Sequence, residues 1–113
     1  MSKRSPLIHA LPCVCCAIEG VDQPNRTEEH HLNSGGLMGK KRRGDAYSIP
    51  LCGWHHRGEL PMDMLITDGQ DTYGPSFALT AKKFRERYHG DDFLLSITNN
   101  CIESGSYQLQ ATA

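Results

Sequence analysis

The chain has 113 residues, of which 38% are hydrophobic and 7% aromatic, and its formal net charge is −1. This length predicts one domain, and so little apolar surface, thinned further by 11 glycines and 6 prolines, predicts that a metal or disulfides must add stability. Because no segment has the apolar length of a signal peptide or a membrane span, we expect a cytosolic protein with reduced thiols and no membrane partner.

The N-terminal half of the chain predicts an arm, two strands and a loop. Residues 1–12 show no periodicity and are expected to form a flexible arm, so that the ordered domain spans residues 13–100. The sequence EEHHL, at 28–32, predicts a short strand, and YSIPL, at 47–51, predicts a second one. The segment between them is rich in glycine and contains the run KKRR, which predicts a flexible basic loop.

The C-terminal half predicts helices. CGWHHRGEL predicts a short helix that ends before Pro61, whereas residues 61–76 have no usable period. Apolar residues recur at helical spacing between Phe77 and Tyr88, with Ser76 as the expected N-cap and Gly90 as the expected end. A further short helix is expected after Gly90, and residues 101–113 are expected to be a frayed tail.

Two pairs of candidate metal ligands are widely separated in the chain. Cys13 and Cys16 have the C-x2-C spacing, and Cys52 and His55 have the C-x2-H spacing, which together suit a closed tetrahedral zinc site. A β-hairpin between the pairs would bring them together. Cys15 is an alternative ligand, although a C-x-C pair suits a shared ion less well. The alternative to a zinc site is that these cysteines are buried small hydrophobic residues.

The histidines that remain suggest a second site. On a helix, His56 is rotated by about 100° from His55, so it cannot easily share the same ion. His30 and His31 point to opposite faces of a strand, although they diverge less at a twisted strand end. A workable hydrolytic arrangement has His30 and His56 on a metal and His31 as a base beside it.

These motifs together resemble the HNH endonuclease family. The C-x2-C pair, the histidine pair in a strand, the loop and then IPLCGWHHRG have the order found in its ββα-metal fold. With GPSFALTAKKFRERYHG they are similar to the phage recombination enhancement function (Ref) type in particular. The resemblance covers roughly residues 13–95 and implies an α+β fold: a small zinc-stapled ββα-metal domain with additional C-terminal helices.

The resemblance also implies site roles, cofactors and partners. His30 and His56 match the ligands of a catalytic divalent metal, Mg²⁺ or Mn²⁺ or else Zn²⁺, and His31 matches the general base. The four residues Cys13, Cys16, Cys52 and His55 match the structural Zn²⁺ positions. The implied activity is metal-dependent hydrolysis of DNA phosphodiesters, single- or double-stranded, in phage recombination or DNA processing, with a recombinase filament as a possible partner.

Two features bear on how the protein would act. The family's middle Asn, which orients the base, is missing from DAYSIP, where Ser48, Tyr47, Asp45 or a backbone carbonyl is a candidate replacement. The basic run supplies candidate phosphate contacts at Lys40, Lys41, Arg42 and Arg43. The alternative function is a zinc-stapled DNA-binding accessory module whose catalysis is absent or depends on a partner.

Overall fold

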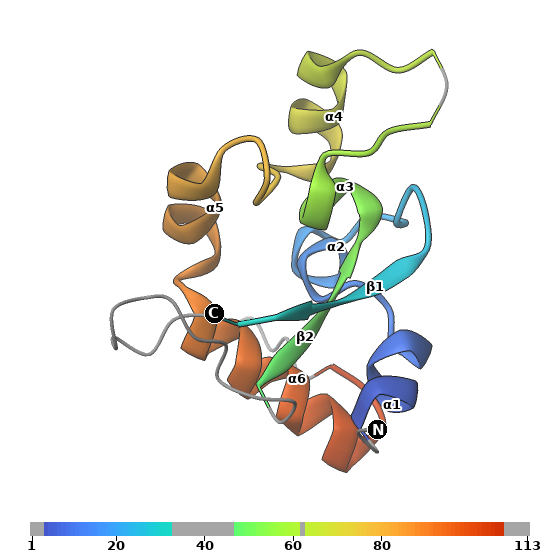
Figure 1. Cartoon of the computed structure of the whole chain (residues 1–113), viewed down its shortest axis with the longest axis vertical. Coiled ribbons are helices and arrows are strands. Elements are labelled where there is room, and N and C mark those ends of the chain that lie inside the picture. The colour runs from blue at the N-terminus through green and yellow to red at the C-terminus, as the bar shows by residue number, and fades with distance from the viewer. Residues whose placement is uncertain (1–3, 33–46, 62, 108–113) are drawn as a thin grey trace.

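The computed structural model describes residues 4–32, 47–61 and 63–107, and its centre is an antiparallel hairpin (Figure 1). Strand β1 (Thr27–His31) pairs with β2 (Ser48–Cys52) so that Thr27 lies opposite Cys52 and His31 lies opposite Ser48. Both predicted strands are therefore present. The hairpin returns the chain from the first pair of candidate ligands to the second.

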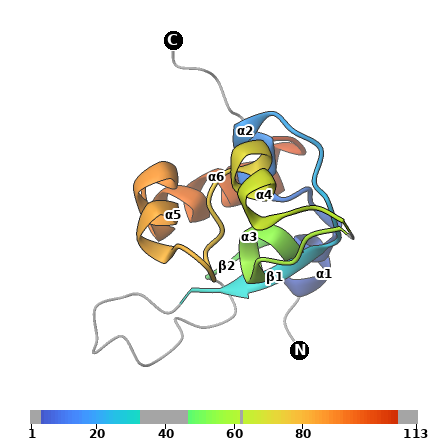
Figure 2. The ribbon, with the colours of Figure 1, turned by 90° about the horizontal axis from the view of Figure 1, so that it is seen from above.

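Helices surround this hairpin. Helix α1 (Arg4–Ala10) contacts both strands, α2 (Val14–Glu19) and α6 (Asp91–Ser104) contact β2, and α3 (Gly53–Arg57) follows β2 directly and contacts β1. Seen from above, α4 (Ile66–Tyr73) and α5 (Ala81–Tyr88) lie on the α3 side of the sheet (Figure 2). The predicted α+β class is confirmed.

The core lies where β2 meets these helices. All five residues of β2 are buried, and Ile49 and Leu51 are fully buried. Trp54, Phe84 and Tyr88 supply the large rings of the core. Trp54 packs in the core, and its indole nitrogen donates a hydrogen bond of 2.9 Å to the carbonyl of Gly74.

The arm that the sequence predicts over residues 1–12 contains a helix. In α1, Ile8 is fully buried, and the Arg4 guanidinium donates to the backbone carbonyl of Ser48 at 2.6 Å. A seven-residue helix is too short to show an apolar period, so only its contact with the hairpin reveals it. The limits of the domain, residues 13–100, stay a prediction.

Helix α4 is an element that the sequence did not predict. Its buried residue is Gly69, and a side chain added there would meet Leu60 at 2.8 Å and Trp54 at 3.2 Å. The helix therefore packs closely through a residue without a side chain. Because the packing position is a glycine, no apolar stripe marks this helix in the sequence.

The last two helices differ from their predicted bounds. The helix expected from Phe77 begins only at Ala81, because the Phe77 amide donates to the carbonyl of His55 at 2.9 Å and holds this segment against α3. It ends at Tyr88, and its C-cap is His89, which is left-handed with φ 63°, one residue before the expected Gly90. Helix α6 continues past residue 100 to Ser104, since Cys101 is buried in the core.

Candidate metal centre and active site

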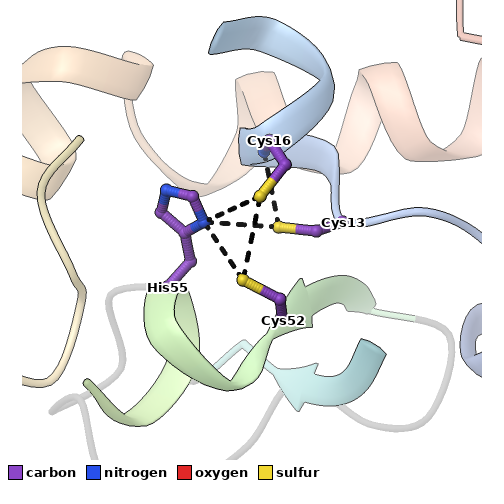
Figure 3. A group of neighbouring side chains, drawn as sticks. All are labelled: Cys13, Cys16, Cys52 and His55. Carbon is purple, nitrogen blue, oxygen red and sulfur yellow. Dashed lines mark hydrogen bonds between the residues drawn. The ribbon is translucent and has the colours of Figure 1, made fainter. Parts of the chain in front are cut away.

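Four buried side chains converge between two distant parts of the chain (Figure 3). Cys13 and Cys16 come from the start of α2, and Cys52 and His55 come from the junction of β2 and α3. Their Sγ and Nδ1 atoms all lie within 4.8 Å of one another. These are the four residues that the sequence predicts as the structural zinc site.

The distances within this group fit a tetrahedral zinc ion. Zn–S bonds of about 2.3 Å and Zn–N bonds of about 2.0–2.1 Å separate two sulfurs by roughly 3.8 Å and a sulfur and a nitrogen by roughly 3.5 Å. In the structure, the sulfurs of Cys16 and Cys52 are 3.8 Å apart, and His55 Nδ1 lies 3.4–3.5 Å from the three sulfurs. The group could therefore hold Zn²⁺.

The outer nitrogen of His55 is fixed by neighbouring groups. His55 Nε2 lies 2.7 Å from the carbonyl oxygen of Tyr73, which can only accept, so Nε2 carries the proton and Nδ1 faces the sulfurs. The Tyr88 hydroxyl is 3.3 Å from the same nitrogen and donates to Glu19 at 2.8 Å, and Arg87 holds that carboxylate. Sequence reasoning missed this support, because only α4 and α5 bring these groups to the site.

The protonation of the group shows why a cation suits it. Burial alone would lower the pKa of His55, but hydrogen bonds and the charges of Cys13 and Cys52 outweigh it and raise that pKa to about 10. Burial likewise would raise the pKa of Cys13, yet hydrogen bonds from its neighbours lower it well below its ordinary value. The buried group thus favours a negative thiolate that a positive charge must balance.

Cys15 lies outside this group. It is fully buried, and burial raises its pKa well above the ordinary value, so it remains a neutral thiol. Cys101 is 2% exposed and belongs to α6, in keeping with an ordinary core thiol. Both cysteines act as small apolar side chains.

A second pair of imidazoles meets beside the first group. The rings of His30, on β1, and His56, on α3, have centroids 5.0 Å apart, and Phe77 packs on His30 at 4.8 Å. Burial, and then the nearby His56, lower the pKa of His30 to about 4. At neutral pH the His30 ring is therefore uncharged and keeps a free nitrogen lone pair, as a metal ligand requires.

The carboxylate of Glu28, which lies on the same face of β1 as His30, fixes the orientation of the His56 ring. Glu28 Oε1 accepts from His56 Nδ1 at 2.7 Å, so Nε2 is left for another partner. The Glu28 carboxylate is itself held by Arg57 at 2.6 and 2.9 Å, and these bonds lower its pKa to about 2. The period-two alternation of EEHHL, which puts Glu28 and His30 on one face, is the sequence signal that would have found it.

His31 leaves the strand on the other face. Glu29 lies on that face, with Oε2 3.6 Å from His31 Nε2, and it accepts hydrogen bonds from the hydroxyls of Ser5 and Ser48. Burial would raise the pKa of Glu29, but these hydroxyl bonds and nearby histidines lower it. Ser48, a candidate replacement for the missing Asn, therefore holds a carboxylate that faces the candidate base.

The predicted phosphate-binding run, Lys40, Lys41, Arg42 and Arg43, lies outside the described residues. The same holds for Asp45. A cavity of about 620 Å³ between α4 and α5 is lined by polar groups that include Gln70, Lys83 and Arg87, but not by the histidines. Among the described residues, none of the predicted site residues lines this cavity.

Comparison with known proteins identifies one family. The sequence model of the family described as "Recombination enhancement, RecA-dependent nuclease" matches residues 2–103. No curated protein and no solved structure matches the chain. Within the described parts of the chain, no helix has both the length and the apolar content needed to cross a bilayer.

Proposed function

Because the chain belongs to the recombination-enhancement family of RecA-dependent nucleases, we propose that it is an HNH-type, metal-dependent endonuclease that hydrolyses DNA phosphodiester bonds. The setting is phage recombination or DNA processing, and the partner is a recombinase filament that presents the DNA. One observation carries the proposal: the ring centroids of His30 and His56 lie 5.0 Å apart beside the buried Cys3His group, and His31 follows His30 in the chain.

The proposed site separates metal binding, by His30 and His56, from proton transfer, by His31. His30 and His56 each offer one ring nitrogen, which is a small enough ligand set to leave room for water and a phosphate oxygen. A divalent ion bound there, Mg²⁺, Mn²⁺ or Zn²⁺, supplies charge neutralisation at the phosphate and at the leaving oxygen. Burial keeps His30 uncharged, and Glu28 turns His56 so that Nε2 is the available atom.

His31 takes the proton of the attacking water. His31 is the last residue of β1 and follows His30 directly in the chain, so we place the scissile phosphate at this end of the strand. Glu29 does the work of the absent Asn: it is held by Ser5 and Ser48 and stabilises the imidazolium that forms when His31 gains the proton. The basic run at residues 40–43, next along the chain, contacts neighbouring phosphates.

Metal content tests the second site directly. Wild-type protein is expected to bind one zinc and, in addition, one Mn²⁺ per chain, measured by elemental analysis and by calorimetric titration. The variants His30→Ala and His56→Ala should lose the Mn²⁺ and keep the zinc, because their rings lie outside the Cys3His group. Unchanged Mn²⁺ binding in both variants would remove the proposed catalytic site.

Replacement of Glu28 is expected to weaken Mn²⁺ binding without abolishing it. Loss of a carboxylate that orients a metal-binding histidine typically costs about 10–100-fold in affinity, and Glu28→Ala should fall in that range by calorimetry. Glu59→Ala is the matched control, because Glu59 also pairs with Arg57, at 2.7 Å, but its carboxylate has no bond to His56 among those described. Equal affinities of the two variants would contradict an orienting role of Glu28.

A zinc-stapled DNA-binding module is the second candidate. It is favoured by the alternation of β1, which carries His31 to the face opposite His30 and His56. Such a module would bind one zinc per chain and no second ion, and would cut DNA only with a partner or not at all. The Mn²⁺ titration separates it from the nuclease.

A further inference from the structure

A row of neighbouring side chains leads from the second site to a surface arginine. The guanidinium carbon of Arg85, on α5, lies 5.4 Å from the centre of the Phe77 ring. Phe77 in turn packs on His30 at 4.8 Å, and His30 meets His56 at 5.0 Å. Arg85 therefore sits at the edge of the two-histidine site, with one aromatic ring between it and a candidate ligand.

The Arg85 guanidinium has uncommitted donors. Arg87, on the same helix, is bound by Glu19, and Arg57 is bound by Glu28, whereas Arg85 has no hydrogen-bond or ion-pair partner within residues 4–32, 47–61 and 63–107. Its side chain is exposed, and its guanidinium carbon lies over the Phe77 ring, within the range of a cation–π interaction. A guanidinium whose N–H groups are free can donate two parallel hydrogen bonds to the oxygens of one phosphate.

The charge of Arg85 reaches the second site. It is among the causes that lower the pKa of His30, after burial and His56, while Asp91, at the start of α6, acts on His30 in the opposite direction. Arg85 is therefore near enough for its charge to act on His30. An anion that approaches the two histidines from the side of α5 comes close to the Arg85 guanidinium.

We propose that Arg85 is a DNA-binding residue that contacts a backbone phosphate next to the one held at His30 and His56. This role rests on the proposed nuclease function. It also gives α5 a place in the DNA-binding surface: residues around Arg85 on this helix, Lys82 and Lys83, are exposed cations as well. The contact is to the backbone, so it carries no sequence preference.

The test compares Arg85→Ala with Arg26→Ala. Arg26 is a suitable control because it is exposed, has no described partner, and precedes the start of β1, at the far end of the strand from His31. Zinc-loaded proteins are titrated with a fluorescent single-stranded oligonucleotide and with a duplex, without added Mg²⁺ or Mn²⁺ so that no DNA is cut, over a range of salt concentrations.

Arg85→Ala is expected to weaken binding and to reduce the slope of log affinity against log salt by about 0.7 on single strands or about 0.9 on duplex. Arg85→Lys should keep the slope, since the charge remains, and lose part of the affinity with the fork. Arg26→Ala should match the wild type. If Arg85→Ala binds both DNAs with wild-type affinity and slope, the role of Arg85 is refuted.

The outcomes separate this inference from the proposed function. A normal salt slope in Arg85→Ala, with Mn²⁺ lost in His30→Ala, refutes the Arg85 contact alone. A reduced slope with Mn²⁺ binding unchanged in His30→Ala keeps Arg85 as a phosphate contact and removes the nuclease site beside it.

Discussion

His31→Ala is expected to reduce DNA cleavage by about 10²–10⁴-fold while the fold and both metals remain, because general-base removal typically has this cost. The His31 ring is at the strand end and outside the Cys3His group, so its truncation leaves the metal ligands in place. The measurement is cleavage of plasmid and single-stranded DNA with Mg²⁺ or Mn²⁺, with and without a recombinase filament on the DNA.

His9→Ala is the matched control for this variant. His9 is an exposed histidine of α1, and its charge, like that of His31, acts on Glu29. The His9→Ala variant therefore tests whether loss of any imidazole near Glu29 lowers the cleavage rate, or only the loss of His31. Cleavage by His31→Ala at the wild-type rate would remove His31 as the base, and equal losses in both variants would point to the shared carboxylate instead.

Cys16→Ala is expected to lose the zinc and to unfold. A structural zinc contributes an apparent free energy of about 10–16 kcal/mol in small zinc domains, which matches or exceeds the roughly 5–15 kcal/mol by which whole domains are stable. Since the ion would join α2 to the junction of β2 and α3, its loss separates the two halves of the core. Zinc analysis and thermal unfolding followed by circular dichroism measure both effects.

Cys15→Ala serves as the control, one residue away. Its thiol is as deeply buried as that of Cys16 but lies outside the group of four, so the substitution should cost about 1 kcal/mol and keep one zinc per chain. Chelation of wild-type protein should reproduce the unfolding of Cys16→Ala. Retention of zinc by Cys16→Ala, with its loss in Cys15→Ala, would show that the ligand set contains Cys15.

The two experiments answer different questions. Loss of zinc is expected to unfold the protein and so to abolish any DNA cleavage. An inactive Cys16→Ala variant therefore says nothing about catalysis. His31→Ala and His9→Ala are informative only in a folded protein with its zinc bound. Metal analysis of every variant therefore comes before its cleavage assay.

What the sequence by itself determined is local. The C-x2-C and C-x2-H spacings fix two pairs of ligands because each pair spans a single turn, and the structure brings these same four residues together. The two strands and α3 were also predicted, since EEHHL, YSIPL and CGWHHRGEL each indicate their structure within a few residues. The adjacent histidines, His30 with His31 and His55 with His56, can also be read directly from the sequence.

Only the tertiary structure decided the contacts between these pieces. The orienting bond from His56 to Glu28, the approach of Arg85 to His30 through Phe77 and the docking of α1 on Ser48 all join residues far apart in the chain. The start of α5 depends on a bond between Phe77 and His55, and α4 packs through a glycine. Such contacts form when the whole core assembles: strand alternation places Glu28 on the face of His30, but no local spacing brings His56, Phe77 or Arg85 to that face.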